Sequence, residues 1–131
     1  MRLHYILLIS PDPSASTAFY QRLFGCAPRV ESDDGEGYVE FRFGATTLAI
    51  RGMDPDLIAS HHLEPQPSSR GWGAFFVFSV DNFDQVYGRA RSAGFAILEG
   101  EFQTKGHRFF ALKDPAGYVL EISEETYGVT L

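Results

Sequence analysis

Asp114-Pro115-Ala116-Gly117-Tyr118-Val119-Leu120-Glu121-Ile122 is the stretch that decides how this chain folds. Its first four residues predict a turn, because proline presets φ and glycine permits a positive φ. The residues from Tyr118 to Ile122 have strand composition. Glu121 therefore lies inside an otherwise apolar strand, where an ionised carboxylate is costly unless something pairs with it. Three roles are open for Glu121: a metal ligand, the acid of a ligand pocket, or a structural residue that faces solvent or forms a salt bridge.

Length, charge and cysteine content exclude several classes of protein. With 131 residues, 44% of them hydrophobic, the chain is long enough for one compact domain. Its 11 basic and 17 acidic residues give a net charge of -6, which argues against nucleic acid or an anionic membrane surface as a partner. No apolar run is long enough to span a bilayer, and residues 1–10 predict a strand rather than a signal peptide. Cys26 is the single cysteine, so we expect no intrachain disulfide and a cytoplasmic location.

Strand-like and helical patterns follow one another in a regular order. Residues 2–9 predict a strand, and residues 13–24 predict a helix that Asp12 caps and Gly25 ends. Further strands are expected at 29–32, 38–43 and 46–51. Residues 52–71 are rich in proline, glycine and serine and predict a linker. After the linker we expect a strand at 74–80, a helix at 83–93 and strands at 96–98, 109–112 and 118–122.

The second half of the chain repeats the first. A shift of 69 residues places Ser10 on Ser79, Asp12 on Asp81 and Gly25 on Gly94, and each pair has the same role at a strand end, a helix start or a helix end. This internal duplication predicts a single α+β domain over residues 1–131, with repeats at about 1–51 and 72–123 joined by the linker 52–71. Each βαβββ repeat would leave one sheet face bare, so we expect curved mixed sheets that pair around a cleft.

An ordered set of motifs, which covers nearly the whole chain, carries a resemblance to one superfamily. The motifs are Tyr5-Ile6-Leu7-Leu8, Asp12-Pro13-x-x-Ser16-x-x-Phe19-Tyr20-x-x-Leu23-Phe24-Gly25, Phe78-Ser79-Val80-Asp81-Asn82-Phe83-Asp84 and the stretch 114–122. Together they resemble the vicinal oxygen chelate superfamily, the group of glyoxalase I, extradiol dioxygenases, fosfomycin-resistance enzymes and bleomycin-binding proteins. The resemblance implies the glyoxalase/bleomycin-resistance fold, but several chemistries share that fold.

The positions that hold a metal in such proteins are mostly occupied here by residues that cannot ligate one. In metal-dependent members, His, Gln or Glu on the first and last strand of each repeat converge on a divalent cation. Glu121 matches this pattern, whereas Ala49 and Phe75 stand at two of the other positions. The first strand offers Tyr5 or, if Pro11 is a one-residue insertion, His4. A catalytic site generally needs three protein ligands, so we expect no cofactor, with Glu121 and His4 as the pair that would hold a divalent metal otherwise.

The same positions predict an aromatic pocket. Tyr5 and Phe75 replace ligands, and strand alternation adds Ile9, Thr47 and Ser79 to the same sheet faces. The expected ligand-binding residues are Tyr5, Leu7, Ala49, Arg51, Trp72, Phe75, Val77, His107, Arg108 and Glu121. Trp72 is equally suited to packing against a sheet edge. His107 and Arg108 follow a glycine-containing segment that hangs over the cleft in related chains, although exposed loop cations are the commoner outcome.

This composition suits a planar or hydrophobic organic ligand. It resembles the metal-free bleomycin- and phenazine-resistance proteins, which implies sequestration of an antibiotic-like small molecule by a homodimer. The alternative is a glyoxalase-, lyase- or dioxygenase-type enzyme with a partial or displaced metal site, in which Glu121 is the candidate catalytic acid or base. A paralogue that has lost its ligand is a third possibility. The sequence leaves open the ligand, whether a reaction is catalysed, and whether the cleft forms within one chain or across a dimer that exchanges repeats.

Overall fold

The chain folds into two compact units, residues 1–68 and 69–131, each with its own four-stranded sheet. The computed structural model describes residues 1–32, 37–62, 74–104 and 107–124, and describes side chains for all of these except 30–32, 99–104 and 107. Both units follow the order strand, helix and three strands, so the predicted α+β fold of two βαβββ repeats is confirmed. That the two units act as a single domain stays a prediction.

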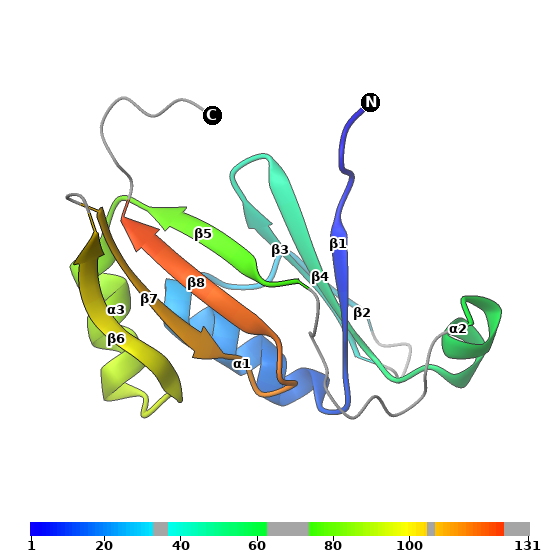
Figure 1. The fold of residues 1–131 in the computed structure, drawn as a ribbon. Coiled ribbons are helices and arrows are strands. Elements are labelled where there is room, and N and C mark those ends of the chain that lie inside the picture. The colour runs from blue at the N-terminus through cyan, green and yellow to red at the C-terminus, as the bar shows by residue number, and fades with distance from the viewer. Residues whose placement is uncertain (33–36, 63–73, 105–106, 125–131) are drawn as a thin grey trace. The chain divides into compact units, whose positions relative to one another are not determined.

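The first unit consists of a mixed sheet with helix α1 against one face (Figure 1). Its elements are β1 (Ile6–Ser10), α1 (Pro13–Phe24), β2 (Val30–Ser32), β3 (Tyr38–Phe43) and β4 (Thr46–Gly52). The strand order is β1-β4-β3-β2, with β1 parallel to β4 and the other pairs antiparallel. The Asp12 carboxylate accepts a hydrogen bond from the Ala15 N–H at 3.1 Å, and Gly25 ends the helix with φ 66°. The predicted helix boundaries are confirmed.

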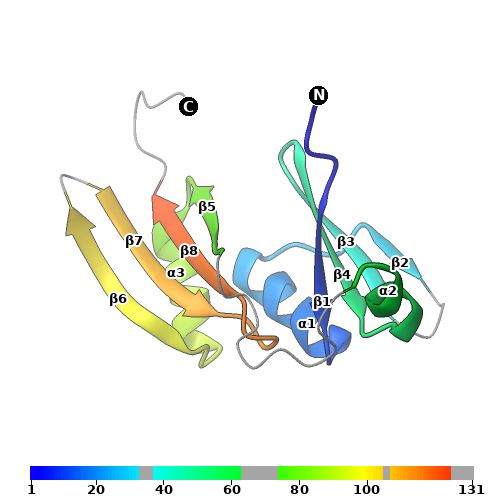
Figure 2. The ribbon, with the colours of Figure 1, turned by 45° about the vertical axis from the view of Figure 1, so that its right-hand side comes forward.

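The second unit repeats this topology (Figure 2). Its elements are β5 (Phe76–Val80), α3 (Phe83–Ser92), β6 (Ile97–Thr104), β7 (His107–Lys113) and β8 (Val119–Glu124), in the strand order β5-β8-β7-β6. The predicted turn before β8 is stabilised by Asp114, whose Oδ1 accepts hydrogen bonds from the N–H groups of Ala116 and Tyr118, both at 2.9 Å. Gly117 has φ 99°, a conformation that side chains with a Cβ rarely adopt.

Alternation along the strands builds one apolar core in each unit, between the sheet and its helix. In the first unit the buried residues are Leu8, Phe41, Leu48 and Ile50 of the sheet with Phe19, Tyr20 and Leu23 of α1. In the second they are Phe110, Leu112, Leu120 and Ile122 of the sheet with Phe83, Val86 and Ala90 of α3. Full burial of one large apolar side chain stabilises a fold by about 1.5–3 kcal/mol. The buried hydroxyls of Ser10 and Ser16 satisfy each other at 2.7 Å and join β1 to α1.

Three predicted elements differ from the structure by more than two residues. The first strand begins at Ile6 rather than at residue 2. The predicted linker contains a helix, α2 (Pro55–Ser60), which Asp54 caps just as Asp12 caps α1; the surrounding prolines and serines concealed this Asp-Pro start signal. Strand β6 extends to Thr104 rather than ending at Leu98. Its pairing with β7 shifts register between Ile97 and Glu99 and again between Glu99 and Phe102, which breaks the alternation that sequence patterns detect.

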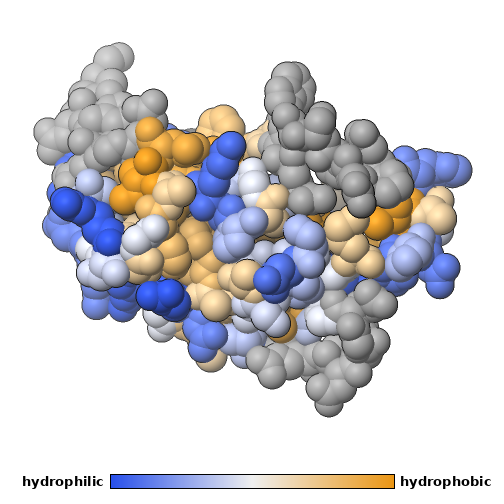
Figure 3. Space-filling view, turned by 90° about the horizontal axis from the view of Figure 1, so that it is seen from below, coloured by the Kyte–Doolittle hydropathy of each residue, from blue (hydrophilic) through white to orange (hydrophobic). Residues whose placement is uncertain are grey.

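The surface mixes hydrophilic and hydrophobic residues over the face seen in Figure 3. Large hydrophobic residues that are exposed in the described part of the chain are Met1, Leu3, Tyr5, Phe75, Val77 and Leu98. Among the described residues, no helix has the length and apolar character needed to cross a bilayer.

Candidate functional site

The sheet of the first unit has one face that α1 does not cover, which we call the open face. Register pairs across β1, β4 and β3 place side chains of three neighbouring strands on the same side. They form a row Leu7, Ala49 and Glu40, and a second row Ile9, Arg51 and Tyr38. On the other side of the Ala49 row, Thr47 pairs with Arg42, and alternation adds Tyr5, just before β1. Four predicted ligand-binding residues, Tyr5, Leu7, Ala49 and Arg51, thus share this face.

A hydrogen-bonded pair of side chains lies on the same face. The Tyr38 hydroxyl donates a hydrogen bond to Oε1 of Glu40 at 2.7 Å, and both side chains are half-buried. Burial raises the pKa of the Tyr38 phenol to about 12, assisted by the hydrogen bond to Glu40 and by the Glu40 charge. Tyr5 adds to this increase, whereas the positive charge of Arg51 opposes it. Tyr38 therefore remains a protonated donor at neutral pH.

Ala49 lies between the rows of the open face that carry Tyr5 and Tyr38. Tyr5 and Tyr38 lie on opposite sides of the Ala49 row, and Tyr5 contributes to the raised pKa of Tyr38. Ala49 has no exposed surface. Tyr5, which is 43% exposed, therefore belongs to the open face, and His4 packs edge-on against its ring at 5.1 Å. That Tyr5 rather than His4 faces a ligand site stays a prediction.

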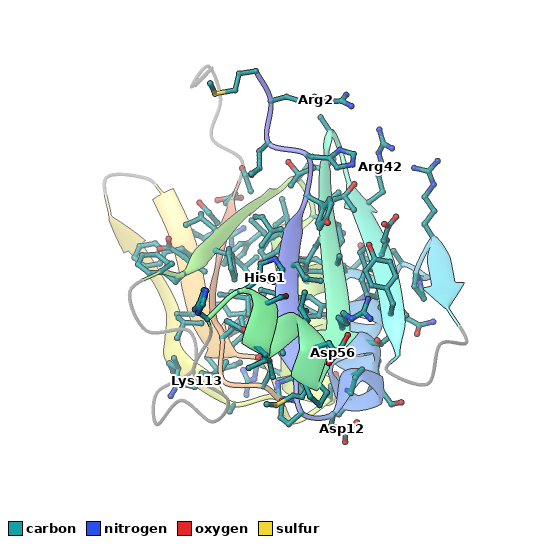
Figure 4. All side chains as sticks on the ribbon, turned by 90° about the vertical axis from the view of Figure 1, so that its right-hand side faces the viewer. Arg2, Asp12, Arg42, Asp56, His61 and Lys113 are labelled. Atoms are coloured by element: carbon teal, nitrogen blue, oxygen red, sulfur yellow. The ribbon has the colours of Figure 1, made fainter. Side chains whose placement is uncertain are left out.

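Helix α2 lies beside the open face, on the side of the sheet opposite α1 (Figure 4). In that view α2, which carries Asp56, lies in front of the sheet, and Arg42 lies at the sheet's opposite end. Arg51 connects the sheet to this helix, because its Nη2 forms an ion pair with the helix-capping Asp54 at 3.2 Å. The segment predicted as a linker therefore borders the candidate site.

The second unit has its own open face, on the side of its sheet away from α3. Val77, Glu121 and Ala111 form one row across β5, β8 and β7. Phe75, just before β5, is 60% exposed, and Val77 is 56% exposed. Glu121 is half-buried, and none of the described residues forms a hydrogen bond or ion pair with its carboxylate. Among the described residues, Glu121 therefore has no partner for a structural salt bridge.

Arg108, another predicted ligand-binding residue, lies on the other side of this sheet, where it contacts α3. Its guanidinium forms ion pairs with Asp84 and Glu124, both at 2.9 Å, and lies 4.6 Å from the ring centroid of Phe83 on α3. Arg108 also lowers the pKa of Asp84 from its usual value by hydrogen bonding. These contacts hold Arg108 on the helix-covered face, because its position in β7 has the same parity as the buried Phe110. A role of Arg108 in ligand binding stays a prediction. The Trp72 position and the His107 side chain, two further predicted contacts, lie outside the described residues.

Tyr38 and Glu40 were missed by reasoning from sequence. The signal that could have found them is the short Gly44-Ala45 turn, which fixes the register of the β3–β4 hairpin and so sets Tyr38 opposite Arg51 and Glu40 opposite Ala49. Following this hairpin would have extended the predicted site from β4 onto β3.

Comparison with known proteins identifies the family. The sequence model of the Glyoxalase/Bleomycin resistance protein/Dioxygenase superfamily matches residues 2–122. The chain belongs to this superfamily. A curated superfamily relative in sequence, the anthracycline biosynthesis protein DnrV of Streptomyces peucetius, is 30% identical over 119 residues. That alignment covers 82% of this chain and 41% of DnrV, so the chain spans less than half of that relative.

Solved structures with the superfamily fold align over nearly the full chain. The fosfomycin resistance protein FosX of Listeria monocytogenes aligns with a TM-score of 0.71 and 17% identity, covering 97% of this chain and 95% of FosX. TioX of Micromonospora sp. ML1 aligns with a TM-score of 0.69 and 18% identity, covering 98% of this chain and all (100%) of TioX. At these identities the similarity concerns the fold.

The residues at the superfamily's metal positions do not fit a metal site in this chain. FosX has been solved with Mn(II) and sulfate, so metal binding occurs on this fold. At the four positions that the superfamily resemblance predicts for metal ligands, this chain has Tyr5, Ala49, Phe75 and Glu121, of which one is a carboxylate. Among the described residues, no group of three or more His, Cys, Asp or Glu side chains is arranged to hold a metal ion. His4, the alternative partner of Glu121, is exposed and packs against Tyr5.

Proposed function

We propose that this protein binds a planar aromatic small molecule without a metal ion, as a sequestering or carrier protein. One observation carries the proposal: exposed aromatic rings occupy equivalent strand starts in both repeats, Tyr5 at 43% and Phe75 at 60% exposure. An exposed ring on a sheet face loses unfavourable contact with water when a flat apolar molecule stacks on it. Apolar neighbours with a few polar groups complete such a site.

The name of a sequence relative supports the same class of ligand. DnrV is an anthracycline biosynthesis protein, and anthracyclines are built on fused rings that include aromatic ones. A flat, multi-ring molecule of this kind suits the chemistry of the open face in the first unit, which carries Tyr5 and Tyr38. We therefore propose a fused-ring aromatic compound, such as an antibiotic or its precursor, as the ligand.

Titration with a panel of anthraquinones and phenazines tests the proposal. Trp72 is the single tryptophan, so its fluorescence provides one readout, and isothermal titration calorimetry provides a second. Saturable binding is expected, and replacing either Tyr5 or Phe75 by alanine should weaken it about tenfold, since a stacked aromatic pair contributes about 0.5–1.5 kcal/mol beyond its buried area. Tyr87→Leu, which removes a ring packed against Phe110 on the helix side, is the control and should leave binding unchanged. No saturable response to any member of the panel would refute the proposal.

Elemental analysis separates this proposal from the enzyme alternative. Protein purified without chelators should contain no stoichiometric Zn, Ni, Mn or Fe, and binding should persist in the presence of a chelator. A stoichiometric metal that chelation removes together with ligand binding would favour the glyoxalase-, lyase- or dioxygenase-type enzyme instead.

We further propose that the protein works in the cytoplasm as a homodimer. Support comes from β5, an edge strand of its sheet that exposes Val77 at 56%, because exposed apolar edge strands favour association. Light scattering should give twice the chain mass, and Val77→Lys should shift it toward the monomer. A monomer at all concentrations would contradict this arrangement.

A further inference from the structure

We propose that Glu40 determines ligand specificity by accepting a hydrogen bond from a hydroxyl group on the bound aromatic molecule. This inference rests on the proposed function, because it names the polar chemistry that an aromatic ligand must carry. Its ligand class is a hydroxyaryl compound, as opposed to an aromatic compound without a hydrogen-bond donor.

The position of Glu40 makes it the acidic group of the tyrosine-lined face. It pairs in register with Ala49 on β4 and with Val30 on β2, and the other neighbour of Ala49 is Leu7, so Glu40 lies within an otherwise apolar row. The superfamily position that Ala49 occupies lacks a carboxylate here, and Glu40 supplies one from the adjacent strand. A ligand stacked against the exposed ring of Tyr5 would meet this carboxylate at its edge.

Tyr38 holds the carboxylate in place without saturating it. Its hydroxyl donates to Oε1 of Glu40 at 2.7 Å, and no described residue donates to Oε2. A carboxylate accepts up to about four hydrogen bonds, so capacity remains for a ligand hydroxyl. Because the Tyr38 phenol has a pKa of about 12, its donation persists over the whole physiological pH range. Tyr38 is thus a positioning residue for Glu40.

Two arginines share this face with Glu40. Arg42, two residues further along β3, is exposed, and its Nε donates a hydrogen bond to the Gly44 carbonyl at 3.4 Å. Arg51, which pairs in register with Tyr38, forms an ion pair with Asp54 at 3.2 Å, and Asp54 balances the charge of Arg51. A ligand that brings a carbonyl or an anion against Glu40 would leave two acceptors facing each other in a partly dry site, which is costly. A hydroxyl donor instead forms a charge-assisted hydrogen bond, the stronger kind.

Binding of a matched pair of probes tests this inference. The probes are a monohydroxyanthraquinone, with its hydroxyl remote from the quinone carbonyls, and its methyl ether, measured by calorimetry at a pH where the hydroxyl is protonated. The wild-type protein should prefer the hydroxy probe by about tenfold to a hundredfold, the range expected for one hydrogen bond to a charged group. Glu40→Leu should abolish this preference by weakening the hydroxy probe alone, and Tyr38→Phe should reduce it partly.

Controls separate a failure of this inference from a failure of the proposed function. Asp56→Asn removes a carboxylate from α2 in the same unit and should leave the preference intact (Figure 4). If both probes bind the wild-type protein equally, or if Glu40→Leu weakens both alike in a folded protein, Glu40 does not set specificity although aromatic binding stands. If neither probe binds the folded wild-type protein, the proposed function itself fails and this inference with it. Circular dichroism establishes that each variant is folded.

Discussion

The Tyr38–Glu40 pair predicts a loss of stability at alkaline pH that Tyr38→Phe removes. Burial, followed by the Glu40 hydrogen bond and charge, raises the pKa of Tyr38 from 10.0 to about 12 in the folded protein. The folded state therefore holds this proton more tightly than the unfolded state. The resulting stabilisation is fully present below pH 10.0 and is lost as the pH rises to about 12.

The size of this stability change follows from the pKa shift of Tyr38. Two pKa units correspond to an upper limit of about 3 kcal/mol. Because Tyr38 is half-buried rather than buried, solvent screening should reduce this to about 1 kcal/mol. Over this pH window the free energy of unfolding of the wild-type protein should thus fall by about 1 kcal/mol more than that of Tyr38→Phe. The fall should be smaller in Glu40→Gln than in the wild-type protein, because the negative charge of Glu40 is removed.

Two measurements check this prediction. Denaturant unfolding at a series of alkaline pH values gives the free energy of unfolding of each variant, and the tyrosinate absorbance counts how many of the six tyrosines titrate late. One late-titrating tyrosine should disappear in Tyr38→Phe. Identical alkaline slopes for the wild-type protein and Tyr38→Phe, with no late tyrosine, would refute the reasoning and remove the support for Tyr38 as the residue that positions Glu40.

Three further variants test the fold around the site. Arg108→Met breaks the ion pair with Glu124 at 2.9 Å and should lower the free energy of unfolding by about 1–2 kcal/mol in urea titrations. Ligand affinity should be unchanged, and a loss of affinity in the folded variant would show that Arg108 takes part in ligand binding. Asp114→Ala leaves two turn N–H groups without their acceptor and should cost about 2 kcal/mol, whereas Asp114→Asn, which keeps Oδ1, should cost clearly less; equal losses would contradict this role. Gly25→Ala, at φ 66°, should lower thermal stability by about 1 kcal/mol, and an unchanged melting temperature would exclude strain there.

Local signals in the sequence were sufficient for the helices and for the repeat. Asp12, Pro13 and Gly25 each act on the backbone within one or two helical turns, so the boundaries of α1 could be predicted to the residue. The same kind of signal, Asp54 followed by Pro55, was present for α2 but was outweighed by the composition around it. Strand β6 was predicted too short because its bulges are set by pairing with β7 and leave no periodic pattern in the sequence.

The sequence by itself determined which face of each strand is apolar, and so it placed Tyr5, Ala49 and Arg51 on one side of a sheet. It could do this because side chains alternate along any strand, whatever its neighbours are. Only the tertiary structure decided what else meets them there. Glu40 joins Ala49 through hairpin register, and the distant Asp84 draws Arg108 to the helix side, since such contacts depend on pairing between segments that are separated in the chain.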